Sequence, residues 1–160
     1  MQALHVIELL AGYDPNGKPI VEKLQVDVLE DNSCQLVRSP AFIKGLAGGD
    51  VIKLNKEDKQ FEIQRRSGNL AIVVFSRGDI NTLAEQLIPE LEKLGGQLDT
   101  ETERMLVFSI HVSCGFEKIE AILNQYVGRD GQSAWQYGNV YDPTDGTTPL
   151  NWWHEILKPQ

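Results

Sequence analysis

The segment from Leu70 to Phe75 constrains the fold most, because it is an unbroken run of apolar residues. Such a run is typical of a central strand that other elements cover on both faces. Asp79 then stands where a helix cap is expected, and apolar residues recur from 80 to 94 at intervals of three and four. The Gly95-Gly96 pair ends this pattern. The sequence therefore predicts a buried strand followed by an amphipathic helix.

The second half of the chain continues with further strands and a helix. Residues 97–102 and 104–112 predict the two strands of a hairpin, and residues 115–127 carry an apolar stripe at helical spacing. A last strand is predicted over residues 133–141. The order β-α-β-β-α-β is that of the ferredoxin-like motif. Because both helices then cover one face of the sheet, we expect the N-terminal sheet to cover the other face.

The first half predicts strands without helices. Polar turn signals at residues 14–17 and 30–33 separate runs in which apolar and polar residues alternate. Residues 45–50 contain two adjacent glycines and are expected to form a flexible connector, and a hairpin is predicted over residues 51–66. This pattern is typical of a small, curled antiparallel sheet or a partial barrel.

The predicted elements divide the chain into three segments. We expect an α+β protein with an antiparallel β unit over residues 1–66, a ferredoxin-like unit over residues 67–141 and an aromatic tail over residues 142–160. A chain of 160 residues can bury a sizeable core, so we expect the two units to fold as one cooperative body. The adjacent Trp152 and Trp153 in the tail are expected either to pack on this body or to meet a partner.

The cysteines and the apolar segments indicate the compartment. Cys34 and Cys114 are far apart in the sequence, which is typical of buried thiols in a reducing environment. The first ten residues lack the basic segment of a secretory signal, and the apolar runs are too short to cross a bilayer. We therefore expect a cytoplasmic protein that does not enter a membrane.

The formal net charge of −8 is unevenly distributed. Residues 1–78 contain ten acidic and ten basic residues, whereas residues 79–160 contain thirteen acidic and five basic ones. A surface of this sign repels phosphate backbones, so nucleic-acid binding is not expected. An acidic half is suited to attract a basic protein partner, although acidic residues also serve solubility alone. No feature of the sequence indicates an oligomeric state.

Five short segments stand in an ordered set along the chain. They are residues 21–24 (Val-Glu-Lys-Leu), 39–42 (Ser-Pro-Ala-Phe), 45–51 (Gly-Leu-Ala-Gly-Gly-Asp-Val), 67–69 (Ser-Gly-Asn) and 135–137 (Trp-Gln-Tyr). In this order the chain resembles the bacterial domain of unknown function DUF4265 over about residues 4–141. Leu70 and Ala71 depart from that family, which usually has small hydroxyl residues there. The resemblance implies an architecture and transfers no catalytic residue, since the family has no established activity.

The sequence contains no catalytic or metal-binding motif. Its three histidines, His5, His111 and His154, lack metal-ligand spacing, and no phosphate-binding or dinucleotide fingerprint is present. Neither a metal nor a cofactor is therefore expected. His111 and Cys114 could form a Cys–His nucleophile, because a thiol at a helix N-terminus has a lowered pKa. A packing role is favoured for both, since no third group is placed to orient the histidine.

Two groups of residues remain as candidates for binding. A ligand pocket where the two units meet could be lined by Gly48, Gly49, Asp50, Ser67, Gly68, Asn69 and His111. A partner could be anchored by Trp135, Tyr137 and Tyr141, which are expected on one strand face, and by Trp152 and Trp153. Our first hypothesis is a non-enzymatic protein that binds another protein, for example an immunity-type protein that neutralises a toxin. The alternatives are a small-molecule sensor and a weak enzyme that uses Cys114 and His111.

Overall fold

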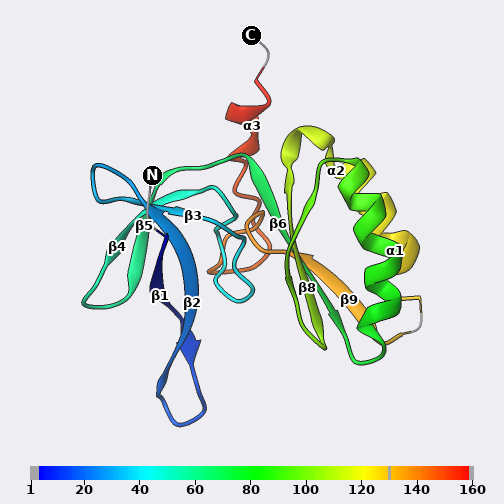
Figure 1. Cartoon of the computed structure of the whole chain (residues 1–160), viewed down its shortest axis with the longest axis horizontal. Helices are drawn as coiled ribbons and strands as arrows, with labels where there is room; N and C mark the ends of the chain where they lie inside the picture. The colour runs from blue at the N-terminus through cyan, green and yellow to red at the C-terminus, as the bar shows by residue number, and fades with distance from the viewer. Residues whose placement is uncertain (1–3, 130, 159–160) are drawn as a thin grey trace.

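The computed structural model describes residues 4–129 and 131–158. It is a mixed α/β structure with two antiparallel sheets that lie side by side (Figure 1). The first sheet is built from the N-terminal part of the chain, and the second sheet carries two helices on its outer face. Within the described residues, no helix has the length and apolar character needed to span a membrane.

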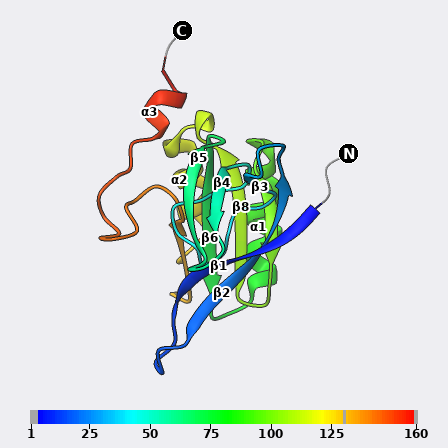
Figure 2. The same cartoon turned by 90° about the vertical axis from the view of Figure 1, so that its left-hand side faces the viewer.

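The first sheet is a five-stranded meander in the order β1-β2-β3-β4-β5. Its strands are β1 (Leu4–Tyr13), β2 (Pro19–Val28), β3 (Cys34–Leu36), β4 (Val51–Asn55) and β5 (Gln60–Arg65). The sheet curls until its two edges approach each other. The amide of Leu10 on β1 donates to the carbonyl of Lys59, the residue before β5, at 3.0 Å. Figure 2, viewed from the side of this sheet, shows the long β1–β2 hairpin extending beyond the other strands.

The second sheet has four strands in the order β7-β8-β6-β9, and every neighbouring pair is antiparallel. Its elements are β6 (Asn69–Ser76), α1 (Ile80–Lys93), β7 (Gln97–Glu101), β8 (Met105–His111), a 3-10 turn η1 (Val112–Cys114), α2 (Phe116–Tyr126) and β9 (Ser133–Tyr137). The predicted buried strand is the central β6, and both helices lie on one face of the sheet (Figure 1).

Helix α1 forms where the sequence predicted it, and its two ends show why. The Asp79 carboxylate accepts a hydrogen bond from the amide of Asn81 at 2.9 Å, which satisfies a free N–H of the first turn. At the other end Gly95 adopts a φ of 87°, and the amide of Gly96 donates to the carbonyl of Leu91 at 2.8 Å. The side of the helix that faces the sheet is formed by Ile80, Leu83, Ala84, Leu87 and Leu91, all buried.

The face of the second sheet opposite the helices is covered differently from the prediction. We expected the N-terminal sheet to cover it, but Val73, Met105 and Val107 pack there against Ala41. Ala41 belongs to the connector, residues 37–50, which joins β3 to β4. Other side chains of the connector, Ile43 and Leu46, are buried in the core of the first sheet. The connector is therefore the layer between the two sheets, because its side chains pack to both sides.

The expectation that residues 45–50 form a flexible connector is wrong for the same reason. Gly48 is buried, and a Cβ atom built on it would lie 2.9 Å from Ser109 Oγ and 3.2 Å from the amide nitrogen of Ser39. The Ser39 hydroxyl also contacts Ser109 Oγ at 2.6 Å and accepts from the amide of Gly48 at 2.9 Å. Glycine stands here because the chain passes close to the second sheet, and this packing holds the connector in place.

The last strand is shorter than predicted. Strand β9 ends at Tyr137, and Tyr141 instead forms an isolated bridge with Pro149. The side chain of Asn139 replaces the next rung of the ladder: its Oδ1 accepts from the amide of Ala71 at 2.9 Å, and its Nδ2 donates to the carbonyl of Asn69 at 2.9 Å. The strand of residues 133–141 is thus corrected to Ser133–Tyr137, because a side chain takes over its pairing.

The aromatic tail packs on the body of the protein. Trp152 donates from Nε1 to the carbonyl of Asn139 at 2.8 Å, and the Arg66 guanidinium lies 5.4 Å from the centre of its ring. Trp153, which begins the short helix α3 (Trp153–Ile156), contacts the ring of Phe116 with a centroid distance of 5.2 Å. Both indoles are half-buried. Of the two outcomes expected for the tail, the described structure therefore contains the packed one.

Candidate functional site

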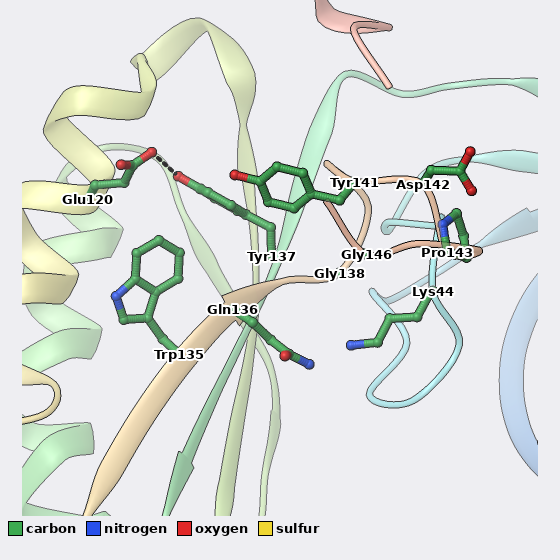
Figure 3. Close-up of a pocket in the computed structure, with 10 residues that line it drawn as sticks. All are labelled: Lys44, Glu120, Trp135, Gln136, Tyr137, Gly138, Tyr141, Asp142, Pro143 and Gly146. Atoms are coloured by element: carbon green, nitrogen blue, oxygen red, sulfur yellow. Dashed lines mark hydrogen bonds between the residues drawn. The ribbon is translucent and has the colours of Figure 1, made fainter. Parts of the chain in front are cut away.

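A cavity of ≈ 400 Å³ lies beside β9, which is an edge strand of the second sheet. It is lined by Lys44, Glu120, Trp135, Gln136, Tyr137, Gly138, Tyr141, Asp142, Pro143 and Gly146 (Figure 3). These residues come from the connector, helix α2, β9 and the loop after β9, so the cavity forms where both halves of the chain meet. Its volume falls within the range of sites that bind small molecules.

One wall of the cavity is aromatic. Trp135 and Tyr137 alternate along β9, so their side chains point to the same face, and their rings meet edge to face with centroids 4.9 Å apart. The indole is held by a 2.9 Å hydrogen bond from Nε1 to Oδ1 of Asn124. Tyr141 lies beyond the strand end and is 41% exposed. The rings therefore offer a preformed apolar surface for a planar ligand.

The hydroxyl of Tyr137 is committed to a carboxylate. It donates to Oε2 of Glu120 at 2.8 Å, as the dashed line in Figure 3 shows. Burial raises the pKa of Tyr137 well above its ordinary value, and the hydrogen bond and charge of Glu120 raise it further. Tyr137 therefore remains protonated at any physiological pH and acts as a fixed donor.

Lys44 is the only cationic side chain among the described residues that line the cavity. Figure 3 shows its ammonium extending toward the side chain of Gln136, whereas the carboxylate of Asp142 points away. No carboxylate of the described residues forms an ion pair with Lys44. Its surroundings remove part of the ammonium's hydration and lower its pKa, although Lys44 is an exposed residue. An anion in the cavity would restore the interactions that the ammonium has lost.

Backbone contacts on both sides of Lys44 fix its position. The carboxylate of Glu22 on β2 accepts hydrogen bonds from three consecutive amides, those of residues 41–43, at 2.8, 2.9 and 3.0 Å. After Lys44, the amide of Gly45 donates to the carbonyl of Gly138 at 2.8 Å, and Arg66 donates from Nη1 to the carbonyl of Gly45 at 2.9 Å. The connector is thereby tied both to the first sheet and to the end of β9.

The residues predicted to form a ligand pocket between the units do lie together, and they bond to one another. The amide of Ser67 donates to Oδ1 of Asp50 at 2.8 Å, and the Asn69 side chain donates to the carbonyl of Gly48 at 2.8 Å. Gly49 has a φ of 88°, and a Cβ atom there would lie 2.8 Å from Cβ of Ser67. Burial raises the pKa of Asp50, and the hydrogen bonds that its carboxylate accepts from Ser67 and Ala47 oppose this rise. The residues of this group do not line the cavity beside β9.

His111 and Cys114 contact different groups. His111 Nδ1 shares a 2.8 Å hydrogen bond with Ser113 Oγ, and its ring lies over Gly68, where a Cβ atom would be 2.5 Å from Nε2. The thiol of Cys114 donates to the carbonyl of Leu94 at 2.8 Å. Within the described residues, no three His, Cys, Asp or Glu side chains are grouped to hold a metal ion.

The cavity contains three of the five aromatic residues proposed from the sequence. Trp135, Tyr137 and Tyr141 line it, whereas Trp152 and Trp153 lie outside it. Sequence reasoning missed Lys44 and Glu120. Lys44 directly precedes the segment, residues 45–50, whose glycines suggested flexibility, and Glu120 is one of several acidic residues on an amphipathic helix. Neither residue belongs to a motif, so no sequence signal pointed to them.

The family model for DUF4265, a domain of unknown function, matches residues 22–135. The chain belongs to the DUF4265 family. The match is narrower than the resemblance over residues 4–141; it includes Lys44 and Glu120 and ends at Trp135, before Tyr141.

A solved structure shows the same fold. It is described as a novel crystal structure of a hypothetical protein from Neisseria gonorrhoeae, and it matches with a TM-score of 0.66 and 19% identity. The match covers 86% of this chain and 94% of the other. At this identity the likeness concerns the fold alone. The search of curated proteins found no significant match.

Proposed function

We propose that this DUF4265 protein binds a small aromatic carboxylate, or a planar anion of similar size, in the cavity beside β9. The observation that carries the proposal is the ammonium of Lys44, which pairs with no carboxylate of the described residues and lies in the same cavity as the rings of Trp135, Tyr137 and Tyr141. An apolar pocket with a few convergent polar groups is the usual form of a small-molecule site. This is the sensor alternative that the sequence left open.

The charges in the cavity also suggest how such a ligand would be oriented. Its carboxylate would meet Lys44, which lies on the Gln136 side of β9, and its ring would pass the edge of the strand toward Tyr137 and Tyr141. Glu120, which already accepts from Tyr137, would repel a second carboxylate but would accept a hydrogen bond from a hydroxyl or an amine. A ligand with an anionic end and a donor at the opposite end of a ring therefore fits best.

A thermal-shift screen tests this proposal. The probes are 4-hydroxybenzoate, 4-hydroxybenzylamine, which reverses the charge, and cyclohexanecarboxylate, which removes the aromatic ring. We expect 4-hydroxybenzoate to raise Tm by about 5 °C or more at saturation, since a hundredfold excess over Kd stabilises by about 2.7 kcal/mol. The two matched probes should shift Tm much less. Equal shifts from the amine and the carboxylate would refute a site built around Lys44.

Binding of a basic protein partner, including the neutralisation of a toxin, remains a second proposal. It is supported by the thirteen acidic and five basic residues of segment 79–160. The two tail tryptophans, which were expected to anchor the partner, are half-buried on the chain itself and give it less support. If the double substitution Trp152→Ala and Trp153→Ala retains a captured partner at unchanged affinity, the tail is not the interface. Catalysis by Cys114 and His111 stays a prediction, as does a cytoplasmic location.

We also propose that residues 67–141 be classed as ferredoxin-like. The strand order β7-β8-β6-β9, antiparallel pairing throughout and two helices on one face support this class. The class agrees with the proposed site in one respect. The cavity uses the edge strand β9 and the loop that follows it, which are positions where loops and neighbouring segments can vary without disturbing the sheet.

A further inference from the structure

A second cavity, of ≈ 800 Å³, lies at one end of the curled first sheet. Because successive strands of a meander run in opposite directions, the starts of β1 and β3 and the ends of β2 and β4 come together there. The turn between β4 and β5 closes one side of this end. The cavity is remote in sequence from the elements around β9 and shares none of the residues that line the first cavity.

The floor of this second cavity is aliphatic. Ile7, Val28 and Leu54 contribute half-buried side chains that continue the core of the first sheet, and Cys34, only 6% exposed, lies among them. Among the described residues that line this cavity there is no Phe, Tyr or Trp. Its surface therefore suits a flexible hydrocarbon chain, in contrast to the planar wall beside β9.

The rim of the second cavity is cationic. Lys56 and Lys59 project from the β4–β5 turn, and His5 lies on β1. The carboxylate of Glu8 pairs with Lys59 at 3.1 Å, while Lys56 forms no ion pair with any described residue. The field of Lys56 reaches the floor: its charge lowers the pKa of Cys34, although the larger effect is burial, which raises it. An uncompensated positive charge thus stands over an aliphatic floor.

We infer that this end of the first sheet binds a single-chain aliphatic anion, with the hydrocarbon on Ile7, Val28 and Leu54 and the headgroup at Lys56. A medium-chain carboxylate is the simplest member of this class. The inference is independent of the proposed function, because it concerns another cavity and another ligand chemistry. It commits to a free amphiphile, since among the described residues the rim offers one lysine without an ion pair, Lys56, instead of the wide basic surface that an anionic membrane attracts.

The thiol on the floor provides a local test. In a Cys114→Ala background, Cys34 is the only cysteine, and its alkylation by neutral iodoacetamide can be followed by mass spectrometry. We expect decanoate, used below its micellar concentration, to slow this alkylation in a saturable manner. Lys56→Gln should raise the concentration for half-protection about tenfold, as expected for the loss of one charge-assisted contact. The matched control, Lys53→Gln on the same hairpin, should leave it unchanged, because Lys53 does not line this cavity.

Three further probes distinguish a single-chain aliphatic anion from a short anion, a cationic amphiphile and an anionic membrane. Acetate lacks the chain, decyltrimethylammonium reverses the charge, and vesicles of phosphatidylglycerol and phosphatidylcholine present anionic headgroups on a surface. We expect none of them to protect Cys34 at concentrations where decanoate does. Protection by the cation equal to that by decanoate, or an equal response of Lys56→Gln and Lys53→Gln, would overturn the inference. Protection by vesicles without protection by decanoate would also overturn it, in favour of a membrane surface.

Discussion

Glu22→Gln should loosen the connector without removing any core side chain. The carboxylate of Glu22 accepts from the amides of Ala41, Phe42 and Ile43 at 2.8, 2.9 and 3.0 Å, with Oε2 serving the first and Oε1 the other two. A glutamine has one acceptor oxygen, and its NH2 group would face an N–H donor. At least one of the three amides therefore loses its partner, and the remaining bonds lose their charge.

We expect the free energy of unfolding to fall by about 1–2 kcal/mol, below the full cost of lost charge-assisted bonds because water reaches part of this segment. For a chain of this size that corresponds to a drop in Tm of roughly 2–8 °C. Urea denaturation followed by far-UV circular dichroism measures the change. Glu57→Gln, in the exposed β4–β5 turn, is the control of equal charge and should stay within about 0.5 kcal/mol. If Glu22→Gln matches that control, Glu22 does not anchor the connector.

Three other substitutions test the packing between the two halves. Gly48→Ala should lower the free energy of unfolding by about 1–3 kcal/mol, because its Cβ would press on Ser109. An unchanged free energy of unfolding in urea denaturation would contradict this close approach. Asp99 is buried, and burial raises its pKa above the ordinary 3.8 while Oδ1 lacks a partner among the described residues. Its ionised form therefore destabilises the fold increasingly as pH rises through that raised value, so Asp99→Asn should be at least as stable as wild type at pH 7. The difference in free energy of unfolding between Asp99→Asn and wild type should shrink toward pH 4. A difference that grows toward pH 4 in urea denaturation would refute this pH dependence. Trp152→Ala should cost about 2 kcal/mol in the same assay if the tail is packed as described, and no cost would show that it is not.

The elements that could be predicted from sequence are those whose signals are local. Helix α1 is the clearest case, because the Asp79 cap, the apolar stripe and Gly95 all lie within or next to the element itself. The central position of β6 followed from the apolar run at Leu70–Phe75, since only a strand covered on both faces tolerates such a run. Membership of the DUF4265 family was likewise predictable from short segments in order.

The errors arose where a residue's role depends on a partner distant in the sequence. Gly48 suggested a flexible backbone. A glycine is needed there because Ser109, some sixty residues later in the chain, approaches it closely. The predicted strand ran on to Tyr141 because the pairing of Asn139 with β6 uses a side chain, which leaves no alternating pattern. Lys44 could not be found for the same reason: the groups that place it, such as Gly138 and Arg66, are separated from it in the chain.

The claim that Lys44 recognises an anion in the cavity beside β9 is tested most directly by calorimetric titration of 4-hydroxybenzoate into wild type and Lys44→Gln. We expect about tenfold weaker binding in the variant at pH 7, the effect of one solvent-exposed charge-assisted contact. With benzoate, which lacks the phenol that itself ionises in this range, we also expect wild-type affinity to fall as pH rises toward 10.5, because desolvation lowers the pKa of Lys44 below that ordinary value and the ammonium is lost earlier. The variant should lack this dependence. Equal affinity of the two proteins, or the same alkaline loss of benzoate affinity in both, would show that Lys44 does not recognise the anion.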